Sequence, residues 1–290
     1  MDDFHIETLD NVSFKMKSPF DFSFISGYGK VFKVFDDQDS GNICFGVKSS
    51  NGKRYFVKFA GAPTAEYNSD IAGAIERLKA SVPIYKDLAY KSLINLVKTE
   101  EIGGGFAMIF DWVDAICAHK MYPEDNKKFR ALPLETRVKI FEDILEFHSL
   151  VAEKDYTAVD FYDGSIMWDS ANERTVLCDI DFYTKKPVYG SEFLWGCSRI
   201  ASPEERIDRA IVDEVSNVYN MGATAFCLLV NDGEDNRARE DWPLSDKLYE
   251  VVRKATDTER SKRQQSIRQL IDEWIGAKQF PLDKRLPRGR

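Results

Sequence analysis

Residues 147–181, FHSLVAEKDYTAVDFYDGSIMWDSANERTVLCDID, hold the most informative pattern in this chain. Helical apolar spacing over Leu134–Leu150 leads into the stretch and predicts a helix. Two short apolar runs, Ser165–Trp168 and Thr175–Asp179, flank the polar turn DSANER and predict a hairpin. Six aspartates fall within 27 residues: Asp155, Asp160, Asp163, Asp169, Asp179 and Asp181. Such a cluster is either a set of solvated turns or a site that works with carboxylates.

Length and charge limit the class of protein. With 290 residues, the chain is long enough for one large domain or for two lobes around a cleft. The formal net charge of −8 disfavours a nucleic-acid partner or an anionic membrane surface, because both attract positive charge. The acidic first 17 residues lack the apolar core of a signal peptide, and no stretch reaches the ~18 apolar residues of a membrane span.

The counts of cysteine and histidine limit which kinds of metal or disulfide site the chain can form. Five cysteines are widely spaced without a CxxC pair, which predicts a reduced, cytoplasmic protein rather than a disulfide framework or a zinc site. Only three histidines are present, so a multi-histidine metal site is not expected. We therefore expect any chemistry to depend on carboxylates and lysine.

Short runs rich in Val, Ile, Phe and Tyr predict strands in the first third of the chain. These runs are Lys30–Asp36, Asn42–Lys48, Lys53–Ala60, Leu93–Val97 and Phe106–Val113. Turn-forming connections join the first three into an antiparallel meander, and the glycines at 103–105 join the last two into a hairpin. Between them, Ile71, Ile75 and Leu78 have helical spacing, and Pro83 ends or interrupts that helix.

From about residue 134 the predicted structure becomes mainly helical. Further helices are expected at Val212–Val230, Ser245–Ala255 and Ser266–Ile275, and Pro281–Arg290 is expected to be a loosely held basic tail. A β-rich part followed by an α-rich part predicts an α+β fold, with a boundary between residues 113 and 114.

The chain contains YFVK at 55–58, MIFDWVDA at 108–115, DID at 179–181 and GCSRIASPE at 196–204, in this order. This order of motifs resembles that of the protein-kinase-like superfamily, in particular bacterial serine/threonine protein kinases. The resemblance covers about residues 25–275. It implies a two-lobed fold, with a nucleotide-binding lobe at 1–113 (an antiparallel sheet and one helix) and a mainly helical catalytic lobe at 114–290. It also implies that ATP and Mg²⁺ bind between the lobes.

Lys58 lies in YFVK, which looks like the lysine-bearing strand of this family. The resemblance gives its ammonium the role of gripping the ATP phosphates. The turn at Ser40, Gly41 and Asn42 lies 17 residues before Lys58 and is the preferred phosphate-covering loop. The segment Gly27–Gly29 contains more glycine but lies 29 residues before Lys58, which is too far for one hairpin and one turn.

Two further parts of the nucleotide site follow from the resemblance. Glu76 is one candidate for the carboxylate that orients the lysine, and Glu66 is the other. MIFDWVDA, residues 108–115, resembles the family's hinge. It implies that Phe110 lies beside the adenine and that the backbone of Asp111 to Val113 contacts the base.

The stretch quoted first resembles the catalytic loop and metal site of the family. Asp160 stands where the catalytic aspartate orients the acceptor hydroxyl, with Asp163 close enough to help. Ser165 stands in place of the metal-binding asparagine, and Asp179 and Asp181 in DID resemble the metal-binding DFG. The His and Arg that precede the catalytic aspartate in the family are absent, since Ala158 and Val159 stand there.

GCSRIASPE, residues 196–204, keeps Gly196, Pro203 and Glu204 of the motif that closes the family's activation segment. NVYNMG resembles the start of a buried helix, with Asn217 in place of Asp, and RQQS resembles a late motif whose Arg263 is expected to pair with Glu204. Phosphotransferases of the aminoglycoside and choline type usually lack the 196–204 element. Its presence favours a protein substrate over a small hydroxyl-bearing molecule.

The resemblance thus implies an ATP- and Mg²⁺-dependent serine/threonine protein kinase. Two alternatives stay open. One is a small-molecule kinase of the aminoglycoside or choline type. The other is a pseudokinase that acts as a binding module without turnover, prompted by Ala158, Val159 and a loop that keeps one of three family glycines.

Overall fold

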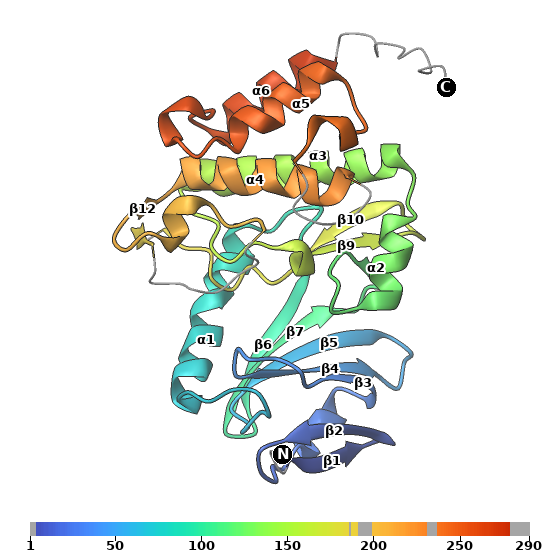
Figure 1. Cartoon of the computed structure of the whole chain (residues 1–290). Helices are drawn as coiled ribbons and strands as arrows, with labels where there is room; N and C mark the ends of the chain where they lie inside the picture. Colours follow the sequence, from blue (N-terminus) through green and yellow to red (C-terminus); the bar gives the residue numbers. More distant parts are fainter. Residues whose placement is uncertain (1–3, 186, 191–198, 231–236, 279–290) are drawn as a thin grey trace. The chain divides into compact units, whose positions relative to one another are not determined.

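The computed structural model describes residues 4–185, 187–190, 199–230 and 237–278. The chain divides into two compact units. The first contains residues 1–89 and 94–114, and the second contains residues 90–93 and 115–290. Figure 1 shows antiparallel strands in the earlier part of the chain and mostly helices in the later part. The prediction of an α+β fold in this order is therefore confirmed.

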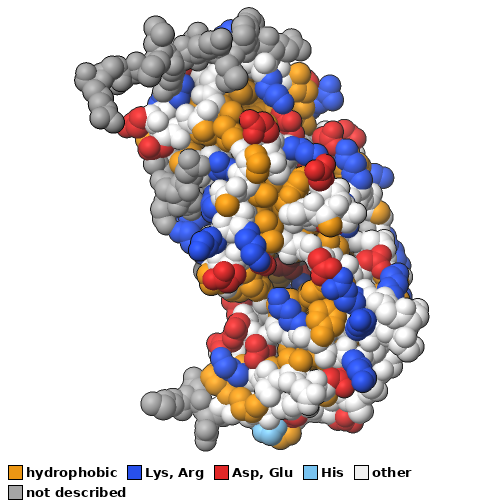
Figure 2. Space-filling view, turned by 90° about the vertical axis from the view of Figure 1, so that its right-hand side faces the viewer, with side chains coloured by type: hydrophobic (Ala, Val, Ile, Leu, Met, Phe, Trp, Pro, Cys, Tyr) orange, Lys and Arg blue, Asp and Glu red, His pale blue; other side chains and the backbone are white. Residues whose placement is uncertain are grey.

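Charged side chains of both signs are interspersed with hydrophobic ones on the face drawn in Figure 2. The excess of acidic residues is therefore not gathered into one acidic patch on this face. Among the described helices, none is both long enough and apolar enough to cross a membrane.

A five-stranded antiparallel sheet forms the first unit's centre, in the order β3-β4-β5-β7-β6. The strands are β3 (Lys30–Phe35), β4 (Asn42–Lys48), β5 (Arg54–Ala60), β6 (Leu96–Ile102) and β7 (Gly105–Asp111). The predicted meander and hairpin are confirmed, and β4 has the predicted bounds. The predicted start of β6 is wrong, because Leu93 bridges to Leu177 and the strand runs on through polar residues to Ile102.

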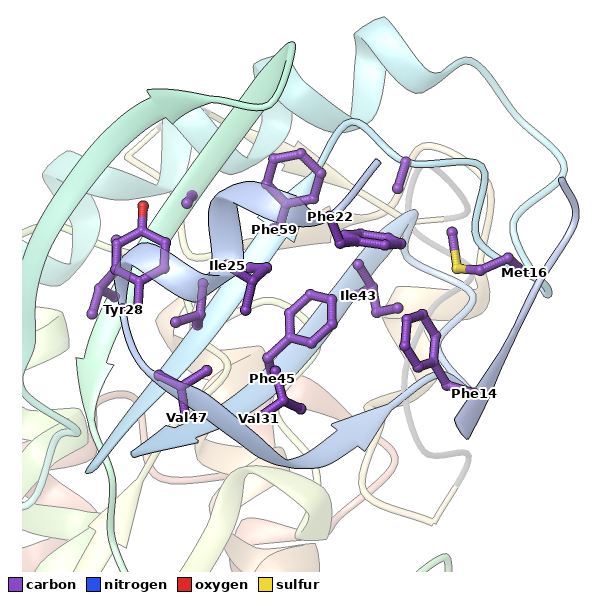
Figure 3. Packing of buried hydrophobic residues seen from close by; sticks show 14 residues of the cluster. Phe14, Met16, Phe22, Ile25, Tyr28, Val31, Ile43, Phe45, Val47 and Phe59 are labelled. Carbon is purple, nitrogen blue, oxygen red and sulfur yellow. The ribbon is translucent and has the colours of Figure 1, made fainter. Parts of the chain in front are cut away.

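An N-terminal hairpin, β1 (His5–Leu9) and β2 (Val12–Met16), is absent from the sequence prediction. Its turn residues Asp10 and Asn11 have φ of 49° and 72°, which is the positive-φ pair of a tight hairpin turn. Figure 3 shows Phe14 and Met16 packed in one buried cluster with Phe45 and Phe59 of the sheet. The hairpin therefore belongs to the core of the first unit.

Helix α1 (Ile71–Asp87) packs on the opposite face of the sheet. Asp70 caps its N-terminus by accepting hydrogen bonds from the amides of residues 72 and 73. Ser81 donates to the Met108 sulfur at 3.3 Å, and the Tyr85 ring lies 5.0 Å from the ring of Phe110. The predicted helix is confirmed, but the structure continues it beyond Pro83 to Asp87.

Five helices build the second unit within the described residues. They are α2 (Pro123–Arg130), α3 (Leu134–Glu153), α4 (Glu214–Leu229), α5 (Asp246–Ala255) and α6 (Ile267–Lys278). Helix α4 packs against α3, α5 and α6, and every residue of it from Ser216 to Leu229 is buried. Helices α3 to α6 confirm the predicted ones, whereas α2 is absent from the prediction. The predicted tail at 281–290 lies outside the described residues.

Two small sheets complete the second unit. Strands β9 (Ile166–Asp169) and β10 (Arg174–Leu177) form the predicted hairpin, and β8 (Ile116–Cys117) extends it. Strand β10 ends at Leu177, so Asp179 lies just beyond the strand rather than in it. Strands β11 (Val188–Tyr189) and β12 (Ile211–Val212) form the other sheet, which the sequence analysis does not predict.

Candidate functional site

Two short turns of the second unit carry the aspartates singled out from the sequence. Asp160 and Asp179 both have a left-handed backbone, with φ of 63° and 56°. Thr157 and Thr184 exchange two backbone hydrogen bonds, of 2.8 and 3.1 Å, three residues before Asp160 and three residues after Asp181. This bridge joins the chain entering the first turn to the chain leaving the second.

A side chain also joins the two turns, because the hydroxyl of Tyr162, two residues after Asp160, donates to the Asp179 carboxylate at 3.5 Å. Burial raises the pKa of Tyr183, and the negative charges of Asp160 and Asp179 raise it further. The structure thus brings together the residues predicted for acceptor orientation and for metal binding.

His148 of α3 fixes the direction of the Tyr183 hydroxyl. Its Nδ1 lies 2.9 Å from the Ile144 carbonyl oxygen and its Nε2 lies 3.0 Å from the Tyr183 hydroxyl. A carbonyl can only accept, so Nδ1 donates and Nε2 accepts from Tyr183. Burial lowers the pKa of His148 to about 4, which keeps the ring neutral at pH 7. The tyrosine proton is thereby directed to the imidazole.

Asn217, at the start of α4, anchors the turn that carries Asp160 through two hydrogen bonds. Its side chain accepts from the Ala158 amide at 2.8 Å and donates to the Ala158 carbonyl at 2.7 Å. All three groups are buried. Because both backbone groups of Ala158 are bonded to one side chain, the position of the chain two residues before Asp160 is fixed.

The predicted metal ligands are oxygen groups of the kind that Mg²⁺ prefers. Ser165 is fully buried, and its hydroxyl has no hydrogen-bond partner in the described part of the chain. The Cys178 amide donates to the Ser165 carbonyl at 3.1 Å, which joins Ser165 to the residue before Asp179. Within the described residues, no three His, Cys, Asp or Glu side chains are close enough to hold a metal. One hydroxyl with one or two carboxylates still fits Mg²⁺, which takes its other ligands from phosphate and water.

Asp163 has a different environment from Asp160. It is fully buried, and its carboxylate lies 2.7 Å from Arg199 and 3.6 Å from the His119 ring nitrogen. Arg199 belongs to the quoted stretch 196–204, but the sequence analysis assigns it no role. Its ion pair joins that stretch to the 3₁₀ turn Asp163–Ser165.

The predicted pairing of Glu204 with Arg263 is confirmed. Two hydrogen bonds of 2.7 and 3.0 Å join the two side chains, which are 3% and 2% exposed. Burial alone would raise the pKa of Glu204, but the hydrogen bonds from Arg263 and Ser216 outweigh it and hold the pKa below its usual range. Gly196, at the other end of the quoted stretch, lies outside the described residues.

In the first unit, Lys58 lies on the central strand β5, between Cys44 of β4 and Met108 of β7. It is 9% exposed, and it is the one buried lysine among the described residues. A lysine in such a position keeps its charge only with anionic or polar partners. The predicted role in binding phosphate needs a positive charge of this kind.

The structure places the two candidate glutamates away from the buried side of α1. Glu76 is 75% exposed and forms an ion pair of 3.7 Å with Lys79. It is two residues from both Ala74 and Leu78, which are buried, so it lies on the opposite side of the helix. Glu66 is exposed in the connection before α1. The pairing of either glutamate with Lys58 stays a prediction.

The turn at Ser40 to Asn42 packs against residues of α1 and of the connection before it. Gly41 has φ of +82°, and a side chain there would collide with Tyr67 and Ala74 at 2.9 Å. Arg77 donates to the Ser40 carbonyl at 3.3 Å, and Asn42 donates to the Ser40 hydroxyl at 3.2 Å. Gly27 ends the 3₁₀ turn Ser23–Gly27 and Gly29 directly precedes β3, whereas Ser40 and Gly41 lie between the paired strands β3 and β4.

The predicted hinge residues differ in their environments. Phe110 is buried against Tyr85, and the carboxylate of Asp111 is bonded to Lys53 at 2.9 Å and Asn95 at 2.7 Å. Within the described residues, the backbone groups of Val113 make no hydrogen bond to other parts of the chain. Val113 therefore has a donor and an acceptor available for a ligand.

No family model matches this chain, and a search of curated proteins finds no match either.

Proposed function

We propose that the chain is an ATP- and Mg²⁺-dependent phosphotransferase with the two-lobed protein-kinase-like fold, and that it transfers the γ-phosphoryl group to a hydroxyl. The observation that carries the proposal is that the turn with Asp160 and the segment with Asp179 are joined by the Thr157–Thr184 backbone bridge and by the Tyr162 hydroxyl, which lies 3.5 Å from the Asp179 carboxylate. Phosphoryl transfer needs one carboxylate that orients the acceptor and another that holds the metal. Both are present in one anchored region of the second unit.

The residues take distinct roles in this proposal. Asp160 accepts or orients the proton of the acceptor hydroxyl, and Lys58 neutralises the phosphates. Asp179, Ser165 and Asp181 are the candidates to hold Mg²⁺, which supplies charge neutralisation at the phosphate oxygens when it is bound. The backbone of Asp111 to Val113 is proposed to contact the base, because Val113 has unused hydrogen-bonding groups.

A serine/threonine protein kinase is the preferred form of this activity. The Glu204–Arg263 ion pair supports it, because Glu204, the last residue of the 196–204 element, is buried and paired within the second unit. A pseudokinase is the second candidate. It is favoured by the turn at Ser40 to Asn42, which packs on Tyr67 and Ala74 and is thus restrained from covering phosphates.

The test is phosphoryl transfer from labelled ATP with Mg²⁺ to basic proteins and, in parallel, to amino-alcohols. Asp160→Asn is expected to lower turnover by roughly 100-fold or more, with the nucleotide dissociation constant nearly unchanged. Asp179→Ala is expected to abolish the magnesium dependence of nucleotide binding. Asp155→Asn is the matched control, because Asp155 is an exposed aspartate with a similar φ of 59°. Equal turnover in Asp160→Asn and Asp155→Asn would refute the role of Asp160.

A further inference from the structure

Four aromatic side chains of the first unit form a cluster on the sheet face that also carries Lys58. They are Phe32, Phe35, Phe56 and Trp112, called the aromatic platform below. Ring centroids are 4.7 Å apart for Phe32 and Trp112, and 5.7 Å apart for Phe35 and Phe56. Phe32 is 38% exposed and the other three are partly exposed. Grouped aromatic rings that stay accessible on a sheet face are typical of a binding surface.

The sequence of β4 makes space for this platform. Gly46 pairs with Phe56, and a side chain at Gly46 would lie 2.8 Å from the rings of Phe32 and Trp112. The backbone of Gly46 does not have the positive φ that would itself require glycine. Its role is therefore to let two rings lie over the strand.

The indole of Trp112 is held in place by a second layer of contacts. Its ring nitrogen donates to Asp114 at 2.9 Å, and Asp114 is held by two hydrogen bonds from Arg54. These bonds, from Arg54 first and then from Trp112, lower the pKa of Asp114 and keep it charged. A ring fixed in this way loses little further freedom when a ligand stacks on it.

Positive charge lies beside the rings. Phe35, Cys44 and Lys58 are direct neighbours across β3, β4 and β5, so their side chains point to the same face. Lys58 also follows Phe56 by two residues, or about 6.6 Å along the strand. A planar ring system joined to an anion matches both features, whereas an apolar peptide matches only the rings.

We propose that the aromatic platform stacks the base of a nucleoside triphosphate whose phosphates pair with Lys58, and that ATP and GTP are therefore bound with similar affinity. The inference rests on the proposed phosphotransferase function and specifies its nucleotide. Stacking on aromatic rings is indifferent to the identity of the base, because every base has a π face. Hydrogen bonds from the backbone of Asp111 to Val113 to the base edge would favour one base, so similar affinity for ATP and GTP requires that stacking on the platform contribute more to binding than these bonds.

The experiment is a calorimetric titration of the full chain with MgATP, MgGTP and magnesium tripolyphosphate, which lacks a base. ATP and GTP are expected to bind within about tenfold of each other. Phe56→Leu and Trp112→Leu are expected to weaken both nucleotides by roughly ten- to hundredfold and to leave tripolyphosphate binding unchanged. A Trp112→Phe variant keeps a ring, so its affinity should stay close to that of the wild type.

Tryptophan emission supplies an independent readout. ATP and GTP should quench the emission of the wild type, and this quenching should disappear in Trp112→Phe and persist in the control Trp242→Phe, whose indole is buried near α5. Nucleotide binding with unchanged affinity in Phe56→Leu, or a preference for ATP of more than a hundredfold, would overturn the platform and leave the proposed function intact. If neither nucleotide binds, both proposals fail.

Discussion

Replacing Arg263 with alanine removes one partner of the buried ion pair between Arg263 and Glu204 in the second unit. Arg263 binds both oxygens of the Glu204 carboxylate, at 2.7 and 3.0 Å. Its guanidinium also donates to the Asp257 carbonyl at 2.6 Å and lies 4.9 Å from the ring of Tyr219. All of these contacts are lost in Arg263→Ala.

The expected loss of stability follows from what stays behind. Breaking a buried ion pair by removing one partner typically costs about 3–5 kcal/mol, because the other charge is left without compensation. Glu204 keeps two partners, since Arg260 and Ser216 lie 2.7 and 2.8 Å from its Oε1 atom. We therefore expect the lower end of that range, about 3 kcal/mol.

Urea denaturation followed by circular dichroism measures this loss. The matched control is Arg268→Ala, which removes the exposed i,i+4 pair with Asp272 and is expected to change the free energy of unfolding by less than about 0.5 kcal/mol. The pH dependence gives a second check. Because the pKa of Glu204 is lowered in the folded state, its stabilisation is present above the ordinary glutamate pKa of about 4.3 and is lost as the pH falls below it. A loss in Arg263→Ala no larger than in Arg268→Ala would refute this reasoning.

Two further predictions concern the supports of the candidate site. Asn217→Ala leaves both buried backbone groups of Ala158 without partners and is expected to cost about 1–3 kcal/mol in urea denaturation; a loss near zero would mean that water replaces the side chain. Burial lowers the pKa of His148 to about 4, so the unfolded chain takes up this proton at higher pH than the folded chain. Stability should therefore decrease as the pH falls from about 6.5 toward 4, and a His148→Gln variant with the same decrease over that window would contradict the assignment.

Strands and helices with a clear apolar period are predictable from this sequence. The seven residues of β4 and the buried stripe of α3 follow directly from period-two and helical spacing. Helix α2 escapes prediction because PEDNKKFR is almost wholly polar and buries one side chain, Phe129. The β1–β2 hairpin also escapes, although the adjacent Asp10 and Asn11 are residues that accept positive φ.

The candidate site is predictable only where resemblance supplies the order of motifs. The ion pair between Glu204 and Arg263, 59 residues apart in sequence, was predictable on that ground. Arg199 and its partner Asp163 were not, because an ion pair formed by folding leaves no local spacing to detect. The aromatic platform is distributed over two strands, β3 and β5, and the segment after β7, so no single stretch of sequence displays it.

A left-handed backbone that ends no helix distinguishes the two aspartates proposed for chemistry from Asp155. Asp160, Asp179 and Asp155 all have left-handed backbones, which cost on the order of 1 kcal/mol each for a residue other than glycine. At Asp155 the conformation has a local purpose, because its amide donates to the Ala152 carbonyl and ends α3. Asp160 and Asp179 end no helix, and the strain at Asp160 is held by a buried Asn217 and by a backbone bridge to the other turn. Strain that serves no local chain reversal persists where the fold maintains a particular carboxylate geometry at a cost in stability.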